Sequence, residues 1–292
     1  MSGARSPGNA RSLADADAGG HGCRLPGPNS GVNRPRRSAL RGGGVVLVLL
    51  AVATARAAPV RRVFEPSDME FEEPGMAELD MQFGLVRGES AYRVSAPDFE
   101  FDLGLLPNLE LDIDGEFAVA GPDTGEFTFD RTAPDNLWTS AKIGLLDVGD
   151  PDSAWSAGLQ LGPKLPLARG NRGVGVEGLV LLGWRFRTTQ LVLNLGGLLD
   201  PEPDPHTPRP AAVEGGIDLT RPIDVDGIWS FDAQLSGVRY FSSDNDQLNV
   251  ALTLIWSPND HLDVSLTALG GPLAGGDRWG VLIGFSPKAR LW

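Results

Sequence analysis

Carboxylates recur at every second position in three consecutive stretches of this chain. They are Glu78, Asp80, Glu100, Asp102, Glu110, Asp112, Asp114 and Glu116. In an extended strand, residues i and i+2 point to the same side, so each stretch gathers its carboxylates on one face. Like charges at this density demand cations or basic partners, and rings of charged groups set ion selectivity in pores. The candidate basic groups for this face are Lys142, Lys164, Arg185 and Arg187.

Two interpretations of these carboxylates remain open. They either form an acidic lining that favours cations, or they pair with Lys and Arg across a solvated interior. Catalysis is poorly supported, because acidic residues recur all along the strands, and no serine lies in a Gly-x-Ser-x-Gly setting. The Asp112-x-Asp114-Gly115 fragment lacks the rest of a calcium-binding loop. We therefore expect no enzymatic activity, no catalytic residue, no cofactor and no dedicated metal site.

The elements that carry these groups show an alternation of apolar and polar residues. For example, Leu248, Val250, Leu252, Leu254 and Trp256 alternate with polar or small residues. A period of two over segments of about ten residues is the signature of transmembrane β-strands. Twelve segments fit: 76–86, 97–106, 109–119, 137–147, 154–165, 174–186, 190–199, 211–220, 228–241, 247–256, 261–269 and 279–290.

Tight and long connections alternate along the chain. Pro107-Asn108 and Thr188-Thr189 are tight, whereas residues 120–136 and 200–210 are long. Short periplasmic turns and longer outer loops are typical of outer-membrane barrels. The pattern predicts an all-β fold, a single antiparallel up-and-down transmembrane β-barrel of about twelve strands. The alternative is a soluble β-sandwich, in which a second sheet covers the apolar face.

Tryptophans lie near the ends of the predicted strands rather than at their centres. They are Trp138, Trp155, Trp184, Trp229, Trp256, Trp279 and Trp292. Indole rings prefer the boundary between membrane and water, and barrels carry an aromatic girdle at each boundary. We therefore predict that these seven side chains lie at the membrane interfaces.

The N-terminal part of the chain resembles an export signal. Residues 1–57 are interpreted as an extension plus a signal peptide, with the signal proper at about 32–57 and cleavage after Ala57. Residues 58–75 lack periodicity and are predicted to form a flexible periplasmic leader, and residues 76–292 the barrel. The only cysteine, Cys23, lies in the part expected to be removed. Residues 58–292 carry 17 Lys and Arg and 36 Asp and Glu, a net charge of −19 that argues against nucleic acid as a partner.

Two strand–turn–strand units and the terminal aromatic carry a resemblance to known proteins. Residues 104–111 (GLLPNLEL) and 256–264 (WSPNDHLDV) each join an apolar strand to one opening Leu-Glu or Leu-Asp. The chain resembles Gram-negative outer-membrane channel proteins. More narrowly, it resembles the family named after the MetA pathway of phenol degradation. The resemblance implies an outer-membrane transporter for hydrophobic or aromatic compounds. Trp292 departs from the pattern, since it is out of phase with the apolar face of 279–285, and we expect a bulge at Pro287 to reset the register.

Together these features predict a barrel in the bacterial outer membrane that passively transports or binds a small solute. Its expected partners are membrane lipid, the solute and the barrel-assembly machinery. The solute is hydrophobic or aromatic by resemblance, or cationic by the acidic lining. The alternatives are a secreted sandwich that acts as a binding module, and a structural barrel without pore activity.

Overall fold

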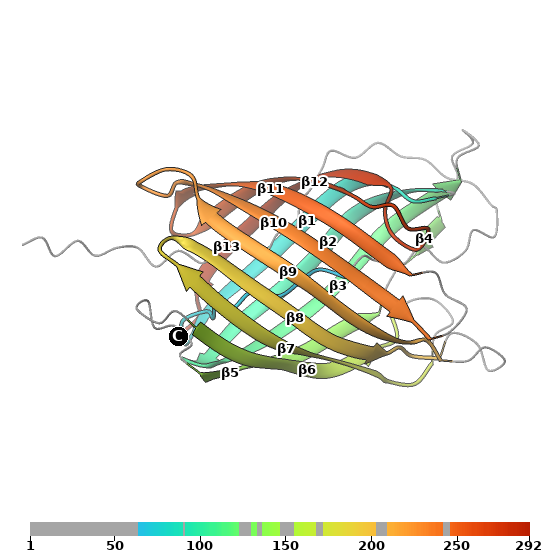
Figure 1. Cartoon of the computed structure of the whole chain (residues 1–292), viewed down its shortest axis with the longest axis horizontal. Coiled ribbons are helices and arrows are strands. Elements are labelled where there is room, and N and C mark those ends of the chain that lie inside the picture. The colour runs from blue at the N-terminus through green and yellow to red at the C-terminus, as the bar shows by residue number, and fades with distance from the viewer. Residues whose placement is uncertain are drawn as a thin grey trace, which may run out of the picture. The chain divides into compact units, whose positions relative to one another are not determined.

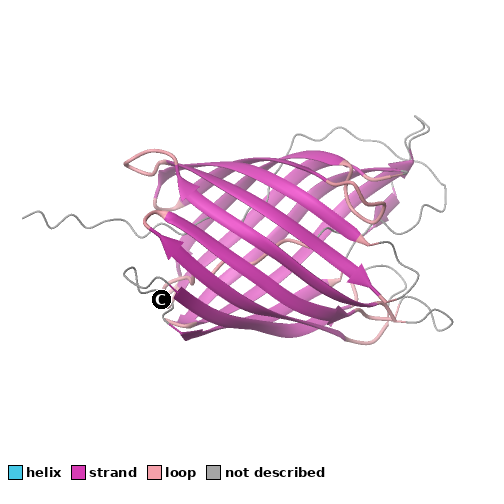
Figure 2. Ribbon diagram, in the orientation of Figure 1, coloured by secondary structure: helices cyan, strands magenta, loops and turns pink. Residues whose placement is uncertain are grey.

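The computed structural model describes residues 64–89, 91–122, 130–132, 136–146, 155–167, 172–202, 209–241 and 246–292. These residues form strands and connections (Figure 2). Within these ranges, no helix is long and apolar enough to cross a membrane. The strands are β1 (Met76–Arg87), β2 (Ala91–Leu106), β3 (Leu109–Pro122), β4 (Asp130–Thr132), β5 (Leu137–Leu146), β6 (Trp155–Leu165), β7 (Gly175–Phe186), β8 (Thr189–Leu199), β9 (Ala211–Pro222), β10 (Trp229–Tyr240), β11 (Gln247–Asn259), β12 (Leu262–Gly270) and β13 (Trp279–Arg290).

Twelve of the strands close into one antiparallel barrel (Figure 1). Each long strand pairs with the next along the chain, β3 pairs with β5, and β1 pairs with β13 to complete the ring. The three-residue strand β4 pairs with β3 inside the predicted long connection 120–136. The prediction of a twelve-stranded up-and-down barrel is therefore confirmed. A sandwich is excluded, because the twelve strands belong to a single closed sheet.

The barrel has a turn end and a loop end, which differ in their connections. At the turn end, β2 and β3 are joined by Pro107 and Asn108, and β7 and β8 by Arg187 and Thr188. The C-terminus lies at this end, at the left of Figure 1. The longer connection 271–278, between β12 and β13, lies at the loop end.

The alternation of residue types separates an apolar outer face from a polar inner face. On β7, Val176, Val180 and Leu182 are exposed, whereas Glu177 and Leu181 are buried. The same outward exposure of apolar side chains recurs around the ring at Leu159, Leu161, Leu193, Leu195, Val213, Ile217, Leu235, Leu248, Val250, Leu252, Leu254, Leu266 and Val281. A continuous apolar surface of this extent is not found on ordinary soluble proteins.

Strand β2 begins six residues earlier than the sequence predicted and contains an irregularity. The register between β2 and β3 shifts by one residue between Ser95 and Asp98. Inward-facing positions are therefore odd before the shift (Arg93, Ser95) and even after it (Asp98, Asp102). Because a one-residue slip turns each side chain to the other face, this bulge brings Arg93 into the interior.

The expected bulge at Pro287 is not present. The pairing of β12 with β13 runs without a shift from Leu269↔Gly280 to Leu262↔Pro287. The even-numbered residues of β13 therefore keep facing inward as far as Lys288, whose side chain is 6% exposed. Trp292, which shares this phase, lies beyond the strand at the turn end, where its indole ring is close to Gly75.

We call residues 64–75 the luminal segment, because they run through the interior of the barrel except for Glu73 and Pro74, which are exposed at the turn end. The sequence predicted a flexible periplasmic leader over 58–75, but Ser67, Asp68 and Met69 are each less than 9% exposed. The Ser67 N–H donates to Asn194 Oδ1 at 2.9 Å, and Asn194 Nδ2 donates to the Ser67 carbonyl at 2.8 Å. This correction has a simple cause, since an aperiodic segment gains its order from the wall around it. Residues 1–63 lie outside the described residues.

Inward-facing glycines make room for the luminal segment. A Cβ atom added at Gly183 would lie 2.9 Å from Met69 Cγ, and one added at Gly216 would overlap Pro66. At the turn end, a Cβ atom at Gly104 would overlap the backbone of Glu72 and Glu73. These positions require glycine because the backbone or side chains of the segment approach the wall closely.

Candidate functional site

The charged lumen is the candidate site. Its buried ion pairs are formed by four basic side chains, those of Arg93, Lys142, Lys164 and Lys288. Each of them contacts carboxylates from two or more elements. Lys164 Nζ lies 2.6 Å from Glu177 Oε2 and 3.4 Å from Asp200 Oδ1. Lys288 Nζ lies 2.7 Å from Glu78 Oε2 and 3.4 Å from Asp263 Oδ2. Each basic group therefore links elements of the barrel that are not all consecutive in the chain.

Lys142 attaches the luminal segment to the wall. Its Nζ lies 3.1 Å from Asp68 Oδ1 in the segment and 3.0 Å from Glu110 Oε1 on β3. It also donates to the Glu70 carbonyl and lies 4.8 Å from the centre of the Phe71 ring. The Lys142 side chain is fully buried. Burying a charge is costly unless it is paired and hydrogen-bonded, and Lys142 meets both conditions.

The predicted carboxylate face is built largely as expected. All eight carboxylates face the interior, with Glu100 and Asp114 half-buried and the other six less than 9% exposed. Carboxylate oxygens of Asp80, Glu100 and Asp102 lie within 4.8 Å of one another, as do those of Asp102, Glu110 and Asp112. Gln160 Nε2 donates to Asp112 Oδ2 at 2.6 Å. Strand pairing has thus joined carboxylates from β1, β2 and β3 into one row.

Of the four basic residues that the sequence suggested for the inner face, two form buried ion pairs and two lie near the turn end. Lys142 and Lys164 are central to ion pairs, as described above. Arg185 is half-buried near the turn end and donates to Gln190 Oε1 at 3.1 Å. Arg187 lies exposed in the β7–β8 turn with a φ of 57°, a left-handed conformation that tight turns favour.

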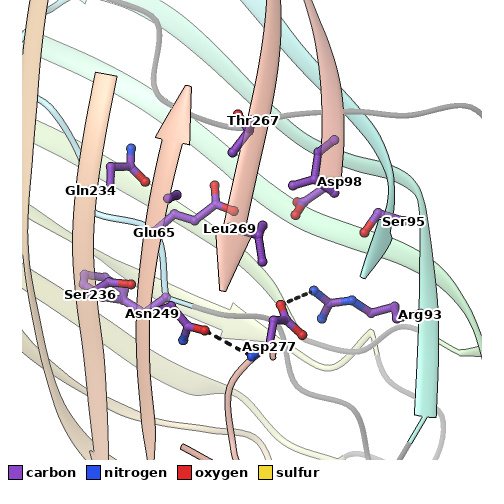
Figure 3. Close-up of a pocket in the computed structure, with 13 residues that line it drawn as sticks. Glu65, Arg93, Ser95, Asp98, Gln234, Ser236, Asn249, Thr267, Leu269 and Asp277 are labelled. Atoms are coloured by element: carbon purple, nitrogen blue, oxygen red, sulfur yellow. Dashed lines mark hydrogen bonds and ion pairs between the residues drawn. The ribbon is translucent and has the colours of Figure 1, made fainter. Parts of the chain in front are cut away.

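A small pocket lies in the lumen towards the loop end (Figure 3). Arg93 and Asp277 belong to its lining and form an ion pair with each other, with Arg93 Nη2 2.9 Å from Asp277 Oδ2. The Asp277 N–H donates to Asn249 Oδ1 at 3.1 Å, and Arg93 Nε lies 3.3 Å from Glu116 Oε1. Burial raises the pKa of Asp277, and the Arg93 guanidinium opposes that rise. The cavity holds about 30 Å³, which is room for about two water molecules.

A second small cavity shows where the luminal segment fills the barrel. It is lined by Phe64 and Glu65 of the segment and by wall residues that include Lys164, Glu177 and Tyr240, and its volume is about 40 Å³. Both cavities are therefore far smaller than the sites that enclose drug-sized ligands, which measure about 300–1,000 Å³. The luminal segment and the wall side chains leave space for water there rather than for a large solute.

One side of the lumen is apolar, and this overturns one of the tryptophan predictions. Trp138 was predicted at the membrane interface, but it is 6% exposed and packs in the interior with Met69, Leu179, Leu181 and Val192. Its even position on β5 puts it in phase with Ser140 and Lys142, which face inward. A smaller interior cluster comprises Leu198, Ala212, Val238 and Tyr240, and Phe64 packs against both clusters.

The other six tryptophans are exposed, as a girdle requires. Trp155 stacks on Trp184 with ring centres 6.0 Å apart, and Trp229 stacks on Trp256 at 6.1 Å. Both pairs lie on neighbouring strands at the turn end. Trp279 begins β13 at the loop end, and Trp292 follows β13 at the turn end.

Several residues of the site were missed by sequence reasoning. Arg93 and Ser95 preceded the predicted start of their strand, and Asp68 and Asp277 lie in segments without periodicity. Lys288 carried a usable signal, because it shares the phase of the small residues Gly280, Gly284 and Ser286. Lys288 was missed because the sequence analysis expected a bulge at Pro287, which would have turned the following residues to the other face.

Comparison with known proteins supports the fold. No protein-family model matches the chain, and no curated protein matches it. Its structure is similar to that of an outer-membrane channel from Pseudomonas putida F1, with 10% sequence identity, a TM-score of 0.56, and coverage of 77% of this chain and 100% of the other. It is also similar to the NanC porin, with 11% identity, a TM-score of 0.50, and coverage of 72% and 100%. The chain therefore has the up-and-down barrel fold of these outer-membrane channels, and at such low identities the likeness concerns the fold alone.

Proposed function

We propose that this protein is an outer-membrane β-barrel that admits or binds a small solute through its charged lumen. The observation that supports the proposal is the difference in polarity between the outer and inner faces of the closed sheet. Apolar side chains are exposed around the ring, whereas the interior holds the ion-paired carboxylates. Closed barrels satisfy every strand hydrogen bond internally, which a lipid environment demands. Export through a cleaved signal and insertion by the assembly machinery belong to this proposal.

The charge of the lumen favours cationic solutes or small cations. Among the described residues, fifteen Asp and Glu residues are less than 9% exposed, whereas the buried basic side chains are the four of Arg93, Lys142, Lys164 and Lys288. A lumen with this excess of negative charge attracts cations and repels anions. Since the luminal segment occupies the interior, larger solutes require that segment to move.

A hydrophobic or aromatic solute is the second candidate, and one observation favours it. The interior cluster around Trp138, Leu179 and Leu181 offers an apolar wall, which Phe64 and Met69 cover. The resemblance to transporters of hydrophobic and aromatic compounds points the same way. A solute with a cationic group and an apolar part would use both walls.

Conductance measurements test the proposal. Residues 58–292, folded in detergent, are inserted in a planar bilayer under a KCl gradient, and we expect steady conductance with a cation-selective reversal potential. Asp112→Asn and Asp114→Asn remove charges from the carboxylate row and should move that potential towards zero. Asp226→Asn, which changes an exposed residue of the β9–β10 turn, is the matched control and should leave it unchanged.

Two results would contradict the proposal in different ways. Protein that folds without detergent or lipid would contradict the membrane barrel itself. Protein that folds only in detergent, conducts no ions and binds no hydrophobic or cationic solute would leave a structural barrel without pore activity.

A further inference from the structure

The luminal segment joins the barrel wall through the peptide bond between Gly75 and Met76, at the turn end. There the Gly75 N–H donates to the Gly104 carbonyl at 2.8 Å, and the Leu291 N–H donates to the Gly75 carbonyl at 2.7 Å. The other end of the segment is Phe64, which packs against the smaller interior cluster near the loop end. The segment therefore runs along the lumen from the turn end into the half that lies towards the loop end.

Two residues of the segment separate the two small cavities of the lumen. Phe64 and Glu65 line both cavities, which have no other lining residue in common. Figure 3 shows Glu65 among the residues that line the first cavity. Phe64 also packs against both interior apolar clusters. Displacement of these two residues would therefore join the cavities and uncover the apolar wall.

The segment is held by side chains rather than by strand pairing. None of the strand pairings among the described residues includes residues 64–75. Ser67 exchanges two hydrogen bonds with the Asn194 side chain, and Asp68 pairs with Lys142. The segment can therefore leave without breaking a pairing between barrel strands. Elements with few backbone attachments are the ones that open locally in folded proteins.

Gly75 provides a hinge at the turn end. Its φ of 83° lies in the left-handed region, which glycine adopts readily. Glu73 and Pro74 beside it are exposed, and Glu73 forms an exposed ion pair with Arg290 at 2.7 Å. Exposed ion pairs contribute little to stability, and hinges are a few residues at the end of an element. Rotation about Gly75 would therefore carry the segment out of the lumen through the turn end.

We propose that the luminal segment is the gate of this pore. With the segment in place, the lumen passes only small ions. With the segment swung out about Gly75, the lumen admits larger solutes. This inference rests on the proposed function, because a gate has an effect only in a barrel that conducts. It adds the element that regulates passage and the end of the barrel through which that element moves.

Removal of the segment is the first test. Residues 58–292 and residues 76–292 are each folded in detergent and inserted in planar bilayers, with KCl on one side and tetraethylammonium chloride on the other. We expect the shorter chain to conduct several-fold more and to pass tetraethylammonium, which the longer chain passes only in brief openings. Equal conductance and equal exclusion of tetraethylammonium would overturn the gate. An absence of conductance from both chains would contradict the proposed function itself.

A reversible lock tests the movement without shortening the chain. Residues 58–292 contain no cysteine. A Cβ atom added at Gly183 would lie 3.4 Å from Met69 Cβ, close to the separation of about 3.5–4.5 Å that disulfides span. The double variant Met69→Cys/Gly183→Cys should therefore form a disulfide on oxidation that fixes the segment to β7. Oxidation should abolish the brief openings, and dithiothreitol should restore them.

Met69→Cys alone is the matched control for the lock. It cannot form the bond, so its openings should be the same with and without the oxidant. Mass spectrometry verifies the disulfide in the double variant. Openings that persist once this bond is complete would overturn the gate, because tetraethylammonium would then pass while the segment stays in the lumen.

Discussion

Replacing Lys142 by methionine should release the luminal segment from the barrel wall. Methionine keeps the length and apolar stem of lysine but lacks the ammonium group. The change removes the ion pair with Asp68, the hydrogen bond to the Glu70 carbonyl and the contact with the Phe71 ring. It also leaves Asp68 and Glu110 buried without this common partner.

The size of the effect follows from these contacts. Breaking one partner out of a buried ion pair costs about 3–5 kcal/mol, and a cation–π contact contributes about 0.5–2 kcal/mol. Part of that cost falls on Glu110, which stays in the wall whether or not the segment is bound. We therefore assign about 3 kcal/mol to the attachment of the segment, which corresponds to roughly a 100-fold change in its release equilibrium.

The assay is maleimide labelling of Ser67→Cys, with and without Lys142→Met. The thiol at position 67 replaces a side chain that is 7% exposed, so labelling reports displacement of the segment. Lys142→Met should accelerate labelling by roughly 100-fold. Lys164→Met is the matched control, because Lys164 pairs with Glu177 and Asp200 of the wall, and it should change labelling little. Equal acceleration by the two variants, or none by Lys142→Met, would refute the assignment of Lys142 as the anchor.

Two further predictions concern the glycines and the tryptophans. Gly216→Val should displace the luminal segment and accelerate the labelling of position 67, because the added Cβ would overlap Pro66. Gly215→Val, on the outer face of the same strand, is the control and should not accelerate labelling. Similar labelling in both variants would contradict the close approach of the segment to Gly216. In single-tryptophan variants in bilayers, brominated lipid should quench the fluorescence of Trp184 and leave that of the buried Trp138 unaffected; quenching of Trp138 would return it to the membrane interface.

The strand pattern and the closure of the barrel were accessible from the sequence for a definite reason. Side chains alternate across a strand, so a sheet with lipid on one side and a polar interior on the other shows its two faces in the residue order. The starts and ends of most strands agree with the prediction to within two residues. The ends of β3 and β11 lie three residues beyond the predicted ones, and the largest difference is in β2, which begins at Ala91 rather than 97, because its bulge interrupts the alternation.

The interior site was accessible only in part. From the sequence, the carboxylates of β1, β2 and β3 were recognisable as one face, and Lys142 was recognisable as a candidate basic group on that face. The partners of these groups were not recognisable, because pairs such as Glu78 with Lys288 join the first and last strands of the barrel, 210 residues apart in the sequence. The closing of the ring between β1 and β13 creates that proximity.

The amino-acid order alone determined the class of fold, the number of barrel strands and the inner position of the acidic face, because these depend on local alternation and turn chemistry. The tertiary structure decided the rest. It placed most of residues 64–75 in the lumen, turned Trp138 inward, and brought Arg93 inside through a one-residue bulge. These features arise from long-range packing inside a closed wall, where contacts join residues that no local pattern in the sequence connects.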